Sequence, residues 1–195
     1  MSPRNLCALL FVMLAYGATP AVGQPELGGA PTVGLGVTLN TDALSLSGPT
    51  PAGAPVGFTV PITFGTVRLE PQVGYIRHTQ SEASQSETTS ALTFGTGAFY
   101  RADFDQTLLL AGARIGVTRE VQTFESASAP EERIATVNLF LGPVVGGEYY
   151  LSDHFSVGAE ARFYYINIGQ PENAPPERSA SVIRTGGAAF LRFHF

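Results

Sequence analysis

The 195-residue chain is short of charge and of long apolar runs. Only 14% of its residues are charged, well below the roughly 25% of ordinary soluble domains. The net charge of −5 argues against nucleic acid as a partner. Beyond its first 23 residues, no stretch reaches the roughly 18 consecutive apolar residues of a membrane-spanning helix. A helical membrane span is therefore not expected.

Cysteine is almost absent as well. The single one, Cys7, lies in an N-terminal segment with the features of a cleaved secretory signal. Arg4 supplies the positive charge, residues 6–16 form an apolar run, and Ala21 and Gly23 are the small residues of a cleavage site. Cleavage after Gly23 would leave a mature chain that has to be stable without disulfides.

Motifs of the common metal, nucleotide and cofactor sites are missing too. No zinc-ligand spacing, phosphate-binding loop, dinucleotide fingerprint or calcium loop occurs, so we expect no metal and no cofactor. The stretch HTQSEASQSE places His78 near Ser81, Glu82 and Ser84, residue types that cleave esters when they converge. Proximity in a polar loop is weak support for convergence, so we expect no catalytic residue and no enzyme activity.

What the sequence does contain is an alternation of apolar and polar residues with a period of two, which is typical of β-strands. Eight segments show it: 32–40, 56–64, 67–77, 90–101, 106–119, 135–151, 155–168 and 181–195. One face of each segment carries mainly Val, Leu, Phe, Ile and Ala, and the other mainly Gly, Thr, Asn, Arg and Glu. The alternation alone does not say which face is enclosed, because a membrane barrel reverses the arrangement of a soluble one.

The lengths of the connections decide between the two. Short connections at 65–66, 102–105 and 152–154 alternate with long ones at 41–55, 78–89, 120–134 and 169–180. Outer-membrane barrels have short periplasmic turns and long external loops. The sequence therefore predicts an all-β fold, an eight-stranded antiparallel up-and-down transmembrane β-barrel, with a soluble barrel around a hydrophobic ligand as the alternative. The expected parts are a signal peptide, 1–23, a short segment, 24–31, and the barrel domain, 32–195.

The C-terminal stretch FLRFHF fits this barrel. Leu191, Phe193 and Phe195 alternate with Arg192 and His194 up to the last residue, which suits one lipid-facing and one lumen-facing side. Phe190 falls on the lumen side as an apolar exception, and His194 is expected there without a partner. Pairing of the last strand with the first would leave no strand edge unsatisfied in lipid.

Two stretches, FTVPITFGTVRLEPQVGYI and LGPVVGGEYYLSDHFSVGAEARFYY, resemble pairs of strands joined by a short turn in small eight-stranded outer-membrane β-barrel proteins of the porin-like, OmpX type. The resemblance covers about residues 32–195. It implies a place in the bacterial outer membrane among its lipids, and assembly by the outer-membrane barrel assembly machinery. The assembly signal would consist of the terminal phenylalanine and the apolar residues that alternate before it: Ala189, Leu191, Phe193 and Phe195. We expect a monomer.

Charged residues also fall at predicted lumen positions, where arginines and glutamates should interleave as ion pairs. They are Arg68, Glu70, Arg114, Glu148, Glu160, Arg162, Arg184 and Arg192. An eight-stranded barrel is just wide enough for side chains to fill it. The charges would therefore form either a structural plug, which we favour, or a polar conduit.

The long connections are acidic. They carry Asp42, Glu82, Glu87, Glu120, Glu125, Glu131, Glu132, Glu172 and Glu177 against Arg133 and Arg178. Such loops could bind divalent cations that bridge lipopolysaccharide, bind a cationic partner, or simply keep the surface soluble. We expect a non-enzymatic outer-membrane protein with a structural, adhesive or surface-contact role through these loops. A narrow channel for ions or small solutes is the alternative, and a lipid-modifying enzyme is the third possibility.

Overall fold

The computed structural model describes residues 32–40, 56–82, 85–126, 129–170 and 180–195. The expected signal peptide, 1–23, and the segment 24–31 lie outside these residues, so their assignment stays a prediction. All described residues belong to one compact unit. Among them, no helix has the length and apolar character needed to cross a membrane.

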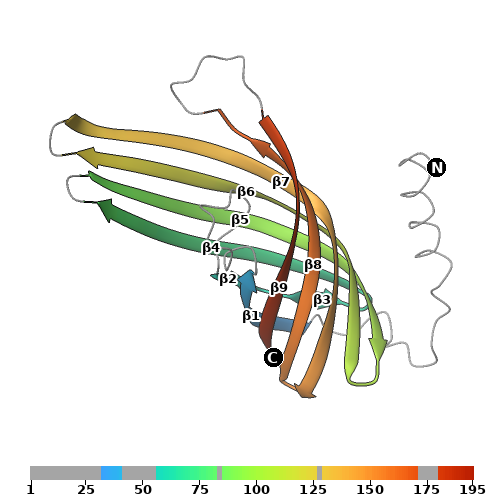
Figure 1. Ribbon diagram of the computed structural model, residues 1–195. Coiled ribbons are helices and arrows are strands. Elements are labelled where there is room, and N and C mark those ends of the chain that lie inside the picture. Colours follow the sequence, from blue (N-terminus) through green and yellow to red (C-terminus); the bar gives the residue numbers. More distant parts are fainter. Residues whose placement is uncertain (1–31, 41–55, 83–84, 127–128, 171–179) are drawn as a thin grey trace, which may run out of the picture. The chain divides into compact units, whose positions relative to one another are not determined.

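The described chain is almost entirely β-strand, and Figure 1 shows the strands wrapping into a barrel. The strands are β1 (Thr32–Asn40), β2 (Val56–Thr59), β3 (Ile62–Phe64), β4 (Val67–Glu82), β5 (Gln85–Phe104), β6 (Thr107–Ser126), β7 (Ala129–Ser152), β8 (Phe155–Ile168) and β9 (Ala180–His194). Each pairs antiparallel with its neighbours, and β9 pairs with β1 from Gly34↔His194 to Asn40↔Ala188. This last pairing closes the sheet, and the predicted eight-stranded antiparallel barrel is confirmed.

β2 and β3 together fill one strand position, which was predicted as a single strand over 56–64. Both pair with β1 on one side and with β4 on the other. They separate at Val60 and Pro61 because proline has no N–H to donate and interrupts the ladder. The Pro61 carbonyl still accepts a hydrogen bond from the Gly34 N–H at 2.9 Å. The nine labelled strands therefore occupy eight positions around the barrel.

The short connections lie where they were predicted, as tight turns at 65–66, 105–106 and 153–154. Gly65 and Asp105 have φ angles of 56° and 54°. This left-handed conformation is free of strain for glycine and is more accessible to aspartate than to most residues. Two turns are shorter than predicted because β5 continues to Phe104 and β7 to Ser152.

The predicted long loops over 78–89 and 120–134 are wrong, because both segments are mostly strand. β4 and β5 stay paired as far as Glu82↔Gln85, and β6 and β7 as far as Ser126↔Ala129. The polar sequence favoured loops, but the Thr residues within it are β-branched and suit a strand. The hydroxyls of Thr79 and Thr88, for example, lie 3.1 Å apart across the first hairpin.

Strands β4–β7 consequently extend past β1, β8 and β9 (Figure 1). Pairing of β7 with β8 begins only at Leu139↔Asn167, so the first ten residues of β7 lie beyond it. We call this part of β4–β7 the projecting sheet. It comprises residues 75–82, 85–92, 119–126 and 129–137.

Burial alternates along the strands and separates two surfaces. Outward-facing side chains are apolar, and residues such as Phe94 and Leu141 are about half exposed, at 53% and 50%. Inward-facing side chains include Arg68, Glu70 and Arg114, which are at most 1% exposed. Apolar groups outside and charges inside are the arrangement of a membrane barrel, the reverse of the soluble alternative.

Candidate functional site

The lumen of the barrel holds a connected set of charged side chains, which we call the lumen network. Glu70 lies at its centre on β4. Its two carboxylate oxygens accept hydrogen bonds from Arg114 on β6 and Arg192 on β9, each at 2.5 Å. The side chains of all three residues are fully buried. Buried charges are stable only when paired, and here one carboxylate on β4 joins β6 and β9, which are not neighbours in the sheet.

Glu148, on β7, is the second carboxylate of the network. One of its oxygens, Oε2, accepts hydrogen bonds from Arg68 at 2.6 Å and from Arg192 at 2.7 Å. The other, Oε1, accepts a hydrogen bond from the Ser156 hydroxyl at 2.6 Å and lies 3.1 Å from Nε2 of His194. Both oxygens of this buried group are therefore satisfied.

The expectation that His194 has no partner is wrong. Its Nε2 contacts both Glu148 and the Ser156 hydroxyl, the latter at 2.9 Å. Ser156 was missed by the sequence analysis, although it occupies an inward position of β8 directly opposite Arg192 of β9. The register between the two strands would have revealed it, but register cannot be read from alternation within one strand.

Glu160, on β8, completes the network. It accepts hydrogen bonds from Arg114 at 3.1 Å and from its near neighbour Arg162. Arg162 in turn donates to the side-chain oxygen of Asn40 at 2.5 Å, and Arg114 donates to that of Gln72 at 3.1 Å. Four arginines and three glutamates are thus joined into one system across the lumen.

Arg184 differs from the other predicted lumen charges. It lies on the inward side of β9 opposite Tyr164, but it is partly exposed. It makes no ion pair with any residue in the part of the chain that the structure describes. The structure therefore brings seven of the eight predicted residues together and leaves Arg184 apart.

Apolar side chains also fill the lumen, in contact with the network. One cluster contains Phe99, Leu108, Leu110 and Val144, and a second contains Phe140, Tyr164 and Ile166. Most of them were not predicted at lumen positions, because apolar residues were expected on the outward face. Phe190, predicted inward, does face the lumen, and the Arg192 guanidinium lies 3.7 Å above the centre of its ring.

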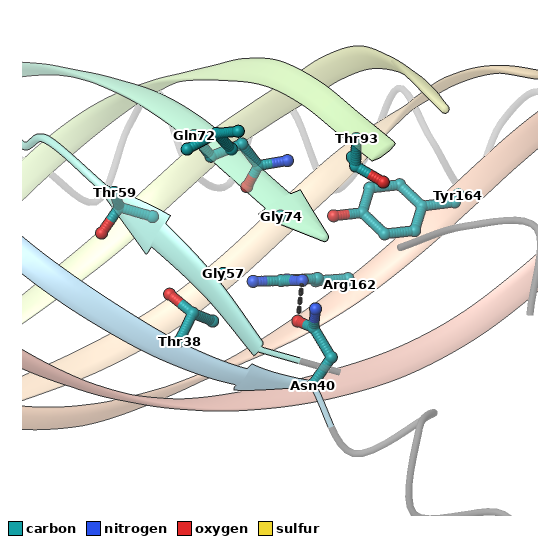
Figure 2. Close-up of a pocket in the computed structure, with 10 residues that line it drawn as sticks. Thr38, Asn40, Gly57, Thr59, Gln72, Gly74, Thr93, Arg162 and Tyr164 are labelled. Atoms are coloured by element: carbon teal, nitrogen blue, oxygen red, sulfur yellow. Dashed lines mark hydrogen bonds between the residues drawn. The ribbon is translucent and has the colours of Figure 1, made fainter. Parts of the chain in front are cut away.

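A small polar cavity lies beside the network between β1, β2, β4, β5 and β8 (Figure 2). Arg162 and Gln72 point into it, together with several threonines. The hydroxyls of Thr38 and Thr59 are buried there without a hydrogen-bond partner in the described residues. About 20 Å³ is open to the centre of a water-sized molecule, enough for about one water, which would satisfy these hydroxyls.

The residues of the expected assembly signal lie at the closing seam of the barrel. Ala189, Leu191 and Phe193 face outward on β9, opposite β1. Phe195 is the most exposed of them, at 73%, and its N–H donates to the Val33 carbonyl at 2.9 Å. The terminal apolar side chains therefore face the lipid.

The possible catalytic group in 78–84 is not assembled. His78 and Ser81 are separated by three positions on β4, so strand alternation places them on opposite faces. The Ser81 hydroxyl instead donates to Ser86 at 3.4 Å, and Ser84 lies outside the described residues. No cluster of three or more potential metal ligands occurs among the described residues.

Several of the acidic positions expected in external loops are now located. Glu87, Glu120, Glu125 and Glu132 lie on strands of the projecting sheet. Asp42, Glu172, Glu177 and Arg178 lie outside the described residues, and the side chains of Glu82 and Glu131 are not described. The predicted loops at 41–55 and 169–180 lie entirely or mostly outside the described residues, so their character stays a prediction.

Comparison with solved structures shows the same fold in three outer-membrane or surface proteins. Ail, the attachment invasion locus protein of Yersinia pestis, is 10% identical over 85% of this chain and 97% of its own, with a TM-score of 0.53. The neisserial surface protein NspA is 13% identical over 85% and 97%, with a TM-score of 0.52. A major outer membrane protein of Thermus thermophilus is 10% identical over 86% and 100%, with a TM-score of 0.56.

No curated protein sequence matches the chain. The chain does match a protein family. The outer membrane protein β-barrel domain family matches residues 7–184, which is most of the chain. With strands that close into a barrel, an outward apolar surface and an inward charged one, this match establishes that the chain belongs to the outer membrane protein β-barrel domain family.

Proposed function

We propose that this chain is a non-enzymatic, monomeric surface protein whose projecting sheet contacts partners outside the cell. The observation that carries the proposal is the length of β4–β7. These strands have 16, 20, 20 and 24 residues, whereas about 9–11 residues suffice to cross the membrane. About two-fifths of each of the longer strands is therefore available above the lipid.

The edges of the projecting sheet suit such contacts. From Tyr75 to Glu82, β4 pairs with β5 on one side and with no other strand of the described chain. The same holds for β7 from Ala129 to Val137, which pairs with β6 alone. Unpaired backbone groups along a strand edge can accept an extended segment of a partner as an additional strand. This gives a physical route to adhesion that needs no catalytic residue.

Truncation of the projecting sheet tests the proposal. Residues 78–89 and 122–134 would each be replaced by Asn-Gly, a two-residue turn that suits a hairpin and keeps the register of Arg77↔Ser90 and Val121↔Ala135. We expect cells displaying the truncated protein to lose at least about tenfold in attachment to a protein-coated surface under flow. Insertion of Gly-Ser at the opposite turn, 105–106, is the control. Equal attachment by truncated and full-length protein would contradict the proposal.

A narrow channel is the alternative, and the polar cavity beside Arg162 is the feature that favours it. The lumen network and the two apolar clusters argue for a plug instead, because they fill the interior with side chains. Conductance in planar bilayers separates the two functions. We expect the purified wild-type protein to give no steady conductance, and open-channel events would favour the channel.

Export and assembly complete the proposal. We propose that residues 1–23 are removed as a signal peptide and that Ala189, Leu191, Phe193 and Phe195 are read by the barrel assembly machinery. The outward position of these side chains at the seam supports this role, since they are accessible until the barrel closes. Sequencing of the mature N-terminus tests the first part, and a start at a residue far from 24 would contradict it.

A further inference from the structure

The charges of the projecting sheet are sorted by face. Because alternate residues of a strand point to opposite sides, its outward face continues the lipid-facing surface and its inward face continues the lumen. The described arginines of this sheet, Arg77, Arg119 and Arg133, all lie on the outward face. Of the described acidic side chains, only Glu125, near the tip, shares that face.

The inward face carries negative instead of positive charge. Glu87, Glu120 and Glu132 lie there, on β5, β6 and β7, and no arginine of the described sheet accompanies them. The strand register confirms the assignment, since Glu87 and Glu132 both flank Phe124 in one row, while Arg133 pairs with Thr123 in the next. The two faces of one sheet therefore carry opposite charge.

The arginines begin where the apolar surface ends. The last purely apolar outward row contains Val73, Phe94, Val117 and Leu139. Arg119 lies in the next row with Tyr75, Arg77 lies in the row after it, and Arg133 in the row after that. Each row adds roughly 5 Å of height in a strand tilted by about 40°. The three arginines therefore start about 5, 10 and 15 Å above the last purely apolar row. The headgroup layer of one leaflet is roughly 5–8 Å deep, so Arg119 starts within it, and the long side chains of Arg77 and Arg133 can extend down towards it.

No carboxylate of the described chain neutralises these arginines. All three are exposed, and none forms an ion pair with a residue of the described chain. A guanidinium binds phosphate with two parallel hydrogen bonds, and a tyrosine in the same row as the first arginine is typical of a membrane interface. Solubility alone would not place every arginine on the lipid-side face.

We propose that Arg77, Arg119 and Arg133 form a site on the outward face of the projecting sheet that binds phosphate groups of the outer-leaflet lipid. The occupant is a phosphorylated lipid of the surrounding membrane. The phosphates neutralise the three arginines and hold the outward face of the projecting sheet against the membrane surface. The acidic inward face is left turned away from the lipid phosphates, which would repel it.

Binding of lipid A to the full-length mature protein, purified and folded in a neutral detergent, tests the proposal. Titration of diphosphorylated lipid A, followed by tyrosine fluorescence, should show affinity that falls on the order of 100-fold in the triple variant Arg77→Ser/Arg119→Ser/Arg133→Ser. Binding of the dephosphorylated lipid should be weak and equal in both proteins. Heat-modifiable migration on gels confirms that each variant is folded.

The opposite face supplies the matched control. The double variant Glu87→Gln/Glu132→Gln changes exposed charges on the same sheet and should bind lipid A within about threefold of wild type, because these residues face away from the site. Equal binding of lipid A by the triple variant and wild type would overturn the proposal. So would equal binding of the two lipids by wild type, or displacement of lipid A by millimolar inorganic phosphate, which would indicate a site for free phosphate.

Discussion

The lumen and the projecting sheet use the same residue types in opposite ways. In the lumen, Arg114 and Glu70 meet at 2.5 Å with no exposed surface, and every carboxylate of the network has an arginine partner. On the projecting sheet, Arg77 and Glu87 lie on opposite faces and are exposed. Enclosed charges must pair because they have lost water, whereas charges in water need not. Segregation outside the lumen therefore points to an external partner rather than to stability.

The largest effect should come from breaking the lumen network at its centre. Glu70→Gln keeps the shape of the side chain but removes the negative charge between Arg114 and Arg192. We expect a loss of about 3 kcal/mol in the free energy of unfolding, the low end for a broken buried pair, because each arginine keeps a second carboxylate. Urea unfolding in lipid vesicles measures it. Glu87→Gln on the projecting sheet should change stability by less than about 0.5 kcal/mol, and similar losses in both variants would contradict the comparison.

A smaller effect is expected where the barrel wall is packed most closely. A Cβ atom on Gly142 of β7 would lie 1.8 Å from the Phe163 carbonyl oxygen, so Gly142→Ala has to shift the backbone, at about 1–3 kcal/mol. Gly147, on the same strand, offers the control, since its Cβ would meet nothing closer than 3.8 Å. Gly147→Ala should leave the unfolding midpoint nearly unchanged. Equal unfolding midpoints for the two variants would show that the backbone at Gly142 shifts to accept the added methyl group at little cost.

The smallest effect is expected on the projecting sheet. Arg77→Ser, Arg119→Ser and Arg133→Ser, made singly, should each change the free energy of unfolding by no more than about 0.5 kcal/mol, because none of the three forms an ion pair within the described chain. Urea unfolding in vesicles of neutral lipid measures this. A loss above about 1 kcal/mol in any of them would mean that these arginines stabilise the fold itself. The projecting sheet would then not differ from the lumen in how its arginines contribute to stability.

Much of the barrel could be predicted from the sequence because alternation is a local property. The bounds of β1 and β8 agree with the predicted segments 32–40 and 155–168, since Gly, Pro, Asn and Asp residues flank them. The projecting hairpins could not be predicted in the same way. Their residues are polar on both faces, so the alternation that identifies a strand disappears although the backbone pairing continues.

The residues of the candidate site also fall into two groups: those that alternation within one strand identifies, and those that depend on how several strands are aligned. Arginines and glutamates at inward positions were recognisable from parity within each strand, which is why seven of the predicted lumen charges lie in one network. The contact of His194 with Glu148 and Ser156 was not recognisable, because it depends on how far β7, β8 and β9 are staggered. Leu108 and Leu110 were missed for a related reason: apolar side chains suit either face of this wall, and only the closed barrel assigns them to the lumen.

The sequence by itself predicted a membrane barrel, because a period of two identifies the strands and two stretches resemble small outer-membrane barrels. The connection lengths were an incomplete guide to the side that faces lipid, since 78–89 and 120–134 are mostly paired strand rather than long loops. Only the tertiary structure decided which charges meet and which remain apart. Partners in a barrel come from strands distant in the chain, such as Glu70 and Arg192, and their distance is set by the stagger of all the strands between them. The opposite charge of the two faces of the projecting sheet became visible for the same reason, since it required the register of four strands at once.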